Sequence, residues 1–218
     1  MIFEAMTATT LPQLIRSLRR EGVLKSPHIE KALARVHRKD FVLDAHADAA
    51  YRDAPLPIGK GQTISQPYTV VFMLELLRPQ RGERVMDVGS GSGWQSALLA
   101  DMVGRRGRVY AIEIVPALCE LGKRNAAKYP ELFRRIEFYC RSATPGLPEI
   151  ATRIHGFDGI ISAAEIREAP KAWRQQLKTG GRLVYPKSTS LFVETKNKDG
   201  TFRVRQYPGF AFVPFVER

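Results

Sequence analysis

The spacing of hydrophobic positions changes along the chain. Over residues 11–40 apolar side chains recur at helical spacing, and Ser26 and Pro27 suit the N-cap and first turn of a second helix there. Residues 41–66 show no clear period and contain several Pro and Gly residues, so we expect a long loop. Long loops inside compact domains usually have a functional role. Helical spacing resumes over residues 67–77.

From residue 84 onward, short apolar runs alternate with helical segments, which is the pattern of a parallel sheet with helical crossovers. Helical spacing ends after residue 185, and the remaining segments have the pattern of strands, with Lys198–Gly200 as a hairpin turn. The expected strands span residues 84–88, 108–113, 136–140, 159–162, 182–185, 191–195, 202–206 and 210–215, and the expected helices span residues 93–102, 116–128 and 170–178.

The length and composition are those of one ordinary domain. The chain has 218 residues, of which 44% are hydrophobic, enough for a substantial core. We therefore expect a single α/β domain over residues 1–218. Its parts would be a helical N-terminal part with the long loop (1–80), a ligand-binding sheet (81–188) and C-terminal antiparallel strands (189–218).

The sequence contains no membrane or secretion signal that we can identify. No apolar run approaches the roughly 18 residues of a membrane span. The first ten residues, MIFEAMTATT, lack the basic-then-apolar order of a signal peptide. We therefore expect a cytoplasmic, monomeric protein without a membrane partner. Cys119 and Cys140 are too few for a disulfide framework and have no metal-site spacing, so we expect two buried thiols and no metal.

The net charge of +12 keeps an anionic partner open. Lys and Arg outnumber Asp and Glu by 34 to 22, and such an excess favours association with nucleic acid. The basic residues are scattered in short pairs, however, instead of gathered in one tract. Nucleic acid is therefore only an alternative partner.

Three alternate glycines follow the first predicted strand of the sheet. The run Asp87-Val88-Gly89-Ser90-Gly91-Ser92-Gly93 leads from that strand into a helix. Glycine lets the backbone turn sharply and approach a ligand closely, so we expect Gly89, Ser90, Gly91 and Gly93 to contact a cofactor. The spacing departs from the dinucleotide pattern, which argues against NAD. Asp87 would repel a diphosphate but suits a cationic amino acid group.

A second acidic residue supports this prediction. Glu113 ends the second predicted strand, 20 residues after Gly93. A carboxylate at this place can accept hydrogen bonds from both hydroxyls of a ribose. The glycine loop and Glu113 together predict a site for a nucleoside cofactor.

The long loop adds a resemblance to a known family. Residues 50–67, AYRDAPLPIGKGQTISQP, together with the glycine loop, resemble the protein-L-isoaspartate O-methyltransferase family. The resemblance extends to residues 157–164, 176–186 and 212–215, and so covers the chain from about residue 10 to 215. It implies a Rossmann-like, class I methyltransferase fold with S-adenosylmethionine as cofactor. The implied substrates are isoaspartyl peptides and damaged proteins, whose methylation begins their repair.

The resemblance also implies site residues. It places Ser65 in the active site near the acceptor, with Gln62, Thr63 and Ile64 in a loop that closes over the cofactor. The alternative role of Ser65 is an N-cap for the helix that begins near Pro67.

One segment departs from the family pattern. Where relatives carry Gly-Asp-Gly, this chain has Arg141-Ser142-Ala143, which lacks the carboxylate expected to contact adenine. We expect Ser142 to hydrogen-bond the adenine amine in its place, with backbone groups as the alternative.

The chemistry fits a carboxylate acceptor. Methyl transfer is an in-line displacement that mainly requires alignment, and a carboxylate is already ionised at neutral pH, so no general base is required. The four His residues are isolated from one another.

Three alternatives stay open: methylation of another carboxylate, a non-catalytic adaptor that binds the cofactor, and methylation of a nucleic acid base. The last usually goes with an Asn/Asp-Pro-Pro-Tyr stretch, where this chain has Ser162-Ala163-Ala164-Glu165.

Overall fold

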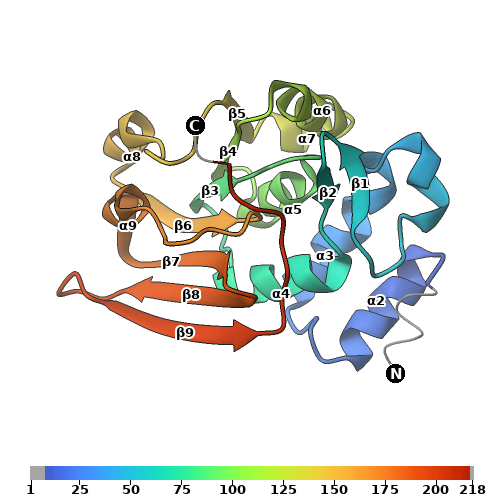
Figure 1. Cartoon of the computed structure of the whole chain (residues 1–218), viewed down its shortest axis with the longest axis horizontal. Helices are drawn as coiled ribbons and strands as arrows, with labels where there is room; N and C mark the ends of the chain where they lie inside the picture. The colour runs from blue at the N-terminus through green and yellow to red at the C-terminus, as the bar shows by residue number, and fades with distance from the viewer. Residues whose placement is uncertain (1–7, 217–218) are drawn as a thin grey trace.

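The computed structural model of the chain describes residues 8–216 and is built on a seven-stranded sheet of order β5-β4-β3-β6-β7-β8-β9 (Figure 1). The expectation about the first ten residues therefore falls mostly outside the described part. The strands β5, β4, β3, β6 and β7 are parallel to one another. Strands β8 and β9 are antiparallel and lie at one edge of the sheet. The strand bounds are β3 (Arg84–Val88), β4 (Arg108–Glu113), β5 (Ile136–Cys140), β6 (Phe157–Ser162), β7 (Leu177–Lys187), β8 (Ser190–Lys196) and β9 (Phe202–Pro208).

Helices cover both faces of the sheet. One hydrophobic cluster packs the N-terminal helices, α4, α5 and α6 against it, and a second packs α8 and α9 on the other face. Trp94 and Trp173, one in each cluster, are 2% and 0% exposed, as expected for core residues. The helix bounds are α2 (Leu11–Arg20), α3 (Pro27–Arg35), α4 (Pro67–Leu77), α5 (Trp94–Val103), α6 (Pro116–Ala127), α7 (Pro130–Phe133), α8 (Pro148–Ile154) and α9 (Lys171–Gln176).

The segment 41–66 is more ordered than the sequence predicts. It contains the last residue of the 3₁₀ turn η1 (Arg38–Phe41), the turn η2 (Asp44–Ala49) and an antiparallel hairpin of β1 (Leu56–Gly59) and β2 (Gln62–Ile64). The prediction of a structureless loop is therefore wrong. The two strands have four and three residues with a register shift between them, too short for a period of two to emerge.

The prediction for residues 170–185 is corrected at one boundary. Helix α9 ends at Gln176, and β7 already begins at Leu177, inside the expected helix 170–178. Leu177 is drawn into the sheet because it pairs with Phe157 of β6, and the register shifts before Arg182 pairs with Gly159. Pairing with a neighbouring strand here overrides the local spacing.

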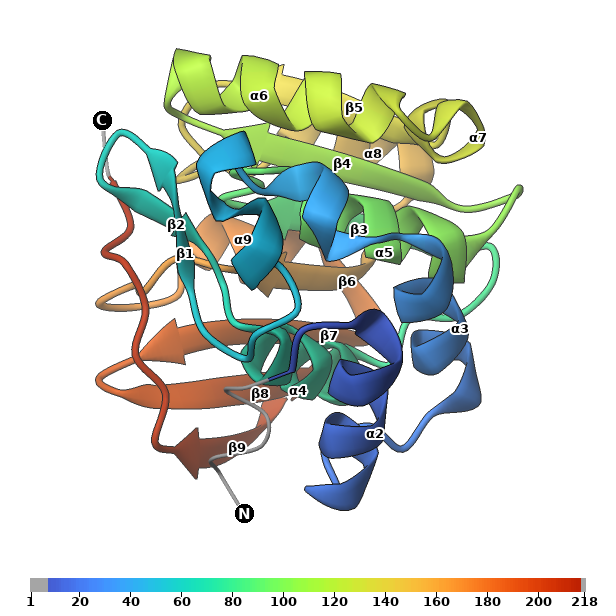
Figure 2. The same cartoon turned by 90° about the vertical axis from the view of Figure 1, so that its right-hand side faces the viewer.

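The prediction of a strand over residues 210–215 is wrong. Residues 209–216, which we call the strap, make one isolated bridge, between Pro214 and Glu165. The amide of Glu165 donates to the carbonyl of Val213, and the amide of Phe215 donates to the carbonyl of Glu165, both at 2.8 Å. The strap crosses the carboxyl ends of the strands instead of joining the sheet, and runs beside the β1–β2 hairpin (Figures 1 and 2).

The two cysteines differ in burial. Cys119 is buried as expected, but Cys140 is exposed because it ends the edge strand β5. Within residues 8–216, no helix combines the length and apolarity needed to cross a membrane.

Asp87 joins the sheet to helix α5. Its side chain is fully buried at the end of β3, where it accepts hydrogen bonds from Nε2 of Gln95 at 2.7 Å and from Oγ of Ser96 at 2.5 Å. Burial raises the pKa of Asp87 to about 6, although both hydrogen bonds oppose the shift. The carboxylate therefore fixes the start of α5 relative to β3.

This raised pKa predicts a pH-dependent stability difference. Between about pH 4 and pH 6 the folded protein holds a proton at Asp87 that the unfolded chain has lost, so this contribution to the free energy of unfolding falls as the pH rises. The difference in the free energy of unfolding between the wild-type protein and Asp87→Asn should therefore fall by about 2 kcal/mol from pH 4 to pH 7. Denaturant titrations measure it, with the exposed Asp44→Asn as control. A pH-independent difference would contradict the assignment.

Candidate active site

A hollow of about 600 Å³ opens at the carboxyl ends of β3 and β4, where ligands bind in open parallel sheets. We call it the loop cavity. The glycine loop and the end of β4 form one wall, the β1–β2 hairpin a second, and the strap a third. Residues that line it include Gln62, Thr63, Gly89, Gly91, Glu113, Leu118, Arg141, Ala143, Ala164, Val213 and Phe215.

The glycine loop is held by the end of β4. The amides of Gly89 and Ser90 donate to the carbonyl of Ile112 at 2.9 and 3.1 Å. Gly89 and Gly91 have φ of 73° and 48°, in the region that favours glycine. A Cβ on Gly91 would lie 3.2 Å from Cδ1 of Ile58 on the hairpin. These two glycines thus let the backbone itself form the wall.

Gly93 has a different environment from the one expected for a cofactor contact. It is not among the residues that line the loop cavity. A Cβ at this position would lie 2.8 Å from the carbonyl oxygen of Gly122 on α6. The absence of a side chain at Gly93 therefore allows the glycine loop to pack closely against that helix.

Glu113 lies in the wall of the loop cavity, at the end of β4. Its side chain is 7% exposed, and its two oxygens accept one backbone amide each, from Gly91 at 3.0 Å and from Val115 at 2.9 Å. Each carboxylate oxygen keeps further acceptor capacity. Glu113 therefore both anchors the glycine loop and presents an acceptor to a ligand.

Two further predicted residues lie away from the loop cavity. Asp87 is not among its lining residues, and both of its oxygens are bound to α5. Ser142 is also not among them, and its hydroxyl donates to Oγ1 of Thr144 at 3.3 Å. The flanking residues Arg141 and Ala143 line the cavity in its place.

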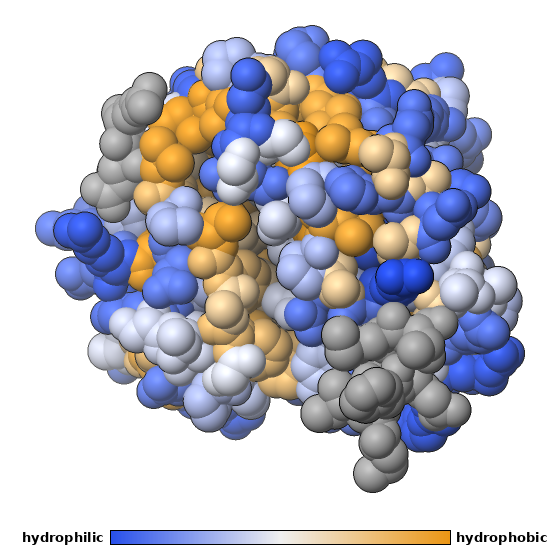
Figure 3. Space-filling model, turned by 45° about the vertical axis from the view of Figure 1, so that its right-hand side comes forward, coloured by the Kyte–Doolittle hydropathy of each residue, from blue (hydrophilic) through white to orange (hydrophobic). Residues whose placement is uncertain are grey.

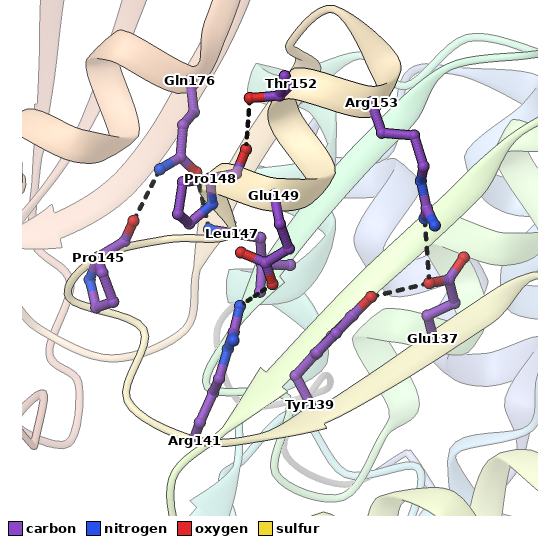
Figure 4. A network of polar contacts seen from close by, with 10 residues as sticks. All are labelled: Glu137, Tyr139, Arg141, Pro145, Leu147, Pro148, Glu149, Thr152, Arg153 and Gln176. Carbon is purple, nitrogen blue, oxygen red and sulfur yellow. Dashed lines mark hydrogen bonds and ion pairs between the residues drawn. The ribbon is translucent and has the colours of Figure 1, made fainter.

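Arg141 is a site residue that the sequence reasoning missed. Its guanidinium pairs with Glu149 on α8 and lies 5.3 Å from the ring centre of Tyr139 (Figure 4). The only signal in the sequence was the departure from the family pattern at residues 141–143. This end of the cavity is thus bounded by a guanidinium and a neutral backbone segment.

Ser65 lies where two further hollows meet. One, of about 790 Å³, is bounded by the strap, and we call it the strap groove. A smaller hollow of about 330 Å³ borders the glycine loop at Ser90 and Gly91, and we call it the junction hollow. Ser65 lines both, whereas Thr63 lines these two and the loop cavity. The face with the strap shows apolar surface interrupted by polar side chains (Figure 3).

Ser90 gives a direct indication of a ligand. Its hydroxyl is buried beside the junction hollow and has no hydrogen-bond partner within the described residues. A buried, unpaired hydroxyl costs stability unless a ligand or water pairs with it. Together with the close backbone of Gly89 and Gly91, it fits a polar ligand bound across the glycine loop.

The alternative role of Ser65 as a helix cap is wrong. The N-cap of α4 is Gln66, and Pro67 is its first helical residue. The free amide of Tyr68 is satisfied by Oδ1 of Asp53, at 2.6 Å. The carbonyl of Ser65 accepts a hydrogen bond from Arg38, but its hydroxyl has no partner among residues 8–216. That hydroxyl is therefore available to a ligand.

Comparison with known proteins gives a consistent result. A family model for protein-L-isoaspartate(D-aspartate) O-methyltransferase matches residues 9–218. A protein-L-isoaspartate O-methyltransferase of Aeropyrum pernix is 42% identical over 209 residues, covering 94% of this chain and 78% of that protein. One of Methanopyrus kandleri is 36% identical over 208 residues, covering 94% and 90%.

A solved structure shares the fold. A Plasmodium falciparum protein assigned to the same methyltransferases, in complex with S-adenosyl-L-homocysteine, superposes with a TM-score of 0.83 at 24% identity, over 94% of this chain and 97% of that one. The Rossmann-like, class I methyltransferase fold expected from the sequence is confirmed. With a family model that covers nearly the whole chain, these findings show that the chain belongs to the protein-L-isoaspartate(D-aspartate) O-methyltransferase family.

Proposed function

We propose that this chain transfers the methyl group of S-adenosylmethionine to the free carboxylate of L-isoaspartyl residues in damaged proteins, as its family membership implies. The observation that carries the proposal is the position of Ser65. It lies between the hollow at the glycine loop and the strap groove, where a methyl donor and a peptide acceptor would meet.

The loop cavity suits the donor. Glu113 would accept hydrogen bonds from the ribose hydroxyls, and the backbone at Gly89 and Gly91 permits close approach. Gln62 and Thr63 would close the cavity from the hairpin, and Ile64 lines the junction hollow beside them. When bound, the cofactor supplies an electrophilic methyl carbon. The residues of the chain exclude water and hold the two reactants in line.

The strap groove suits an acceptor that is already ionised. Among the described residues that line it, none has a titratable side chain. An alcohol or amine acceptor would need a base, whereas a carboxylate with a pKa of about 4 has already lost its proton at neutral pH. The Ser65 hydroxyl would donate a hydrogen bond to one carboxylate oxygen and so aim the other at the methyl carbon.

Three further statements stay predictions from the sequence. They are that the protein is a monomer, that it is cytoplasmic and that residues 1–218 form one methyltransferase domain. Among the predicted cofactor contacts, Asp87, Gly93 and Ser142 do not line the loop cavity, and their roles likewise stay predictions.

The role of Glu113 predicts a loss of cofactor affinity. Glu113→Ala removes the proposed acceptor of the ribose hydroxyls and the hydrogen bond that anchors Gly91 of the glycine loop. Binding of S-adenosyl-L-homocysteine should therefore weaken by about 1–3 kcal/mol, or roughly 5- to 150-fold in Kd. Calorimetry measures the change, with Glu120→Ala, an exposed residue of α6, as control. An unchanged Kd would mean that Glu113 does not face the ribose.

The role of Ser65 predicts a different kinetic signature. Ser65→Ala should lower kcat on an isoaspartyl peptide at least about tenfold, while the Kd of S-adenosyl-L-homocysteine changes less than about threefold, because the hydroxyl is proposed to act on the acceptor. Ser65→Thr, which keeps a hydroxyl, serves as the matched control. Wild-type kcat in Ser65→Ala would remove the serine from the mechanism.

A further inference from the structure

Arg38 is a buried cation that the proposed mechanism does not use. It begins the 3₁₀ turn η1, and its side chain is 1% exposed. Burial lowers the pKa of Arg38 to about 10, partly offset by the charge of Asp53, so the guanidinium stays charged at neutral pH. A buried charge is costly unless it is well hydrogen-bonded, so the partners of this side chain are informative.

The partners of Arg38 are backbone carbonyls on both sides of the β1–β2 hairpin. Before the hairpin, Nη1 donates to the carbonyl of Ala50 at 2.8 Å, and Nη2 donates to that of Ala54 at 2.9 Å. After the hairpin, Nη2 donates to the carbonyls of Ile64 at 3.5 Å and Ser65 at 3.1 Å. One guanidinium thus joins the two ends of the segment that carries Gln62, Thr63 and Ser65.

Arg38 also contacts α5, the helix that follows the glycine loop. The guanidinium carbon lies 5.5 Å from the ring centre of Trp94, the first residue of α5. The indole of Trp94 donates to the carbonyl of Val36 at 3.2 Å, two residues before Arg38. The amide of His37, the residue before η1, donates to the hydroxyl of Tyr129 at 3.0 Å. The arginine is thereby held relative to the helix that follows the glycine loop.

We propose that Arg38 is a positioning residue for methyl transfer: it fixes the Ser65 backbone, and with it the Ser65 hydroxyl, relative to the glycine loop through contacts with Trp94 and with the carbonyls at both ends of the hairpin. This inference rests on the role proposed above for Ser65. In-line transfer tolerates little misplacement, because an error of about 1 Å in the reacting atoms can cost roughly a hundredfold in rate.

Lysine cannot replace this arginine. The guanidinium carries five donors in a rigid planar fork, which here reaches carbonyls in two separate segments, whereas an ammonium is a single point of donation on a flexible stem. Arg38→Lys keeps the charge but loses contacts at one end of the hairpin. The variant therefore separates positioning from the simple presence of a cation.

The test compares Arg38→Lys with Arg182→Met. Arg182 is half-buried and, like Arg38, donates to a backbone carbonyl, that of Leu77 at 3.0 Å, but at the opposite end of α4 from Ser65. Arg38→Gln is a second variant for use if the lysine variant does not fold. For each protein, four quantities are measured: the thermal midpoint, kcat on an isoaspartyl peptide, the Kd of S-adenosyl-L-homocysteine, and the rate of native-state cleavage by trypsin after Lys60, which is exposed in the hairpin turn.

The expected result is specific to Arg38. In Arg38→Lys, kcat should fall at least about tenfold with a smaller change in Kd, and cleavage after Lys60 should accelerate at least about tenfold. Arg182→Met should keep the wild-type kcat and the wild-type cleavage rate at a thermal midpoint comparable to that of Arg38→Lys. Wild-type kcat in Arg38→Lys, or equal losses in both variants, would overturn the inference. If the wild-type protein does not methylate the peptide, the proposed function fails, and an unchanged cleavage rate after Lys60 still overturns the role of Arg38.

Discussion

Two carboxylates at the ends of neighbouring parallel strands hold the glycine loop, and the rest of the site depends on them. Asp87, at the end of β3, binds two side chains of α5, and Glu113, at the end of β4, binds the amide of Gly91. Glu113 therefore holds the loop directly, and Asp87 holds the helix that follows it, before any ligand enters. Because Glu113 also lines the cavity, the same contact that shapes the backbone wall presents an acceptor to the cofactor.

The sequence predicted the sheet well because its strands are local and regular. The bounds predicted for β3, β4 and β5 agree with the structure, since each is a short apolar run between turn residues. The β1–β2 hairpin, the early start of β7 and the irregular strap were not predicted. The hairpin strands are too short to show a period, whereas the start of β7 and the path of the strap depend on pairing with residues far along the chain, which the spacing of side chains does not encode.

The predicted site residues differ in whether they line the loop cavity: Gly93, Asp87 and Ser142 do not. Gly89, Gly91 and Glu113 follow from the strand–loop–helix pattern, and all three line the cavity. Asp87 precedes Val88 in the same strand, and successive side chains of a strand point to opposite faces. The two residues therefore differ: Val88 lines the cavity and Asp87 turns to α5. Arg38 was not identified because its partners are carbonyls, which no side-chain motif reveals.

Methylation of an isoaspartyl carboxylate by this chain is tested most directly by one comparison of two peptides. Two peptides of identical sequence, one with L-isoaspartate and one with normal aspartate, are incubated with the protein and S-adenosylmethionine labelled in the methyl group. Products are trapped quickly in acid, because methyl esters hydrolyse in base. We predict label in the isoaspartyl peptide at a rate at least about a hundredfold above that in the aspartyl peptide. Equal labelling of both peptides, or labelling of neither by a protein that binds the cofactor, would contradict the account.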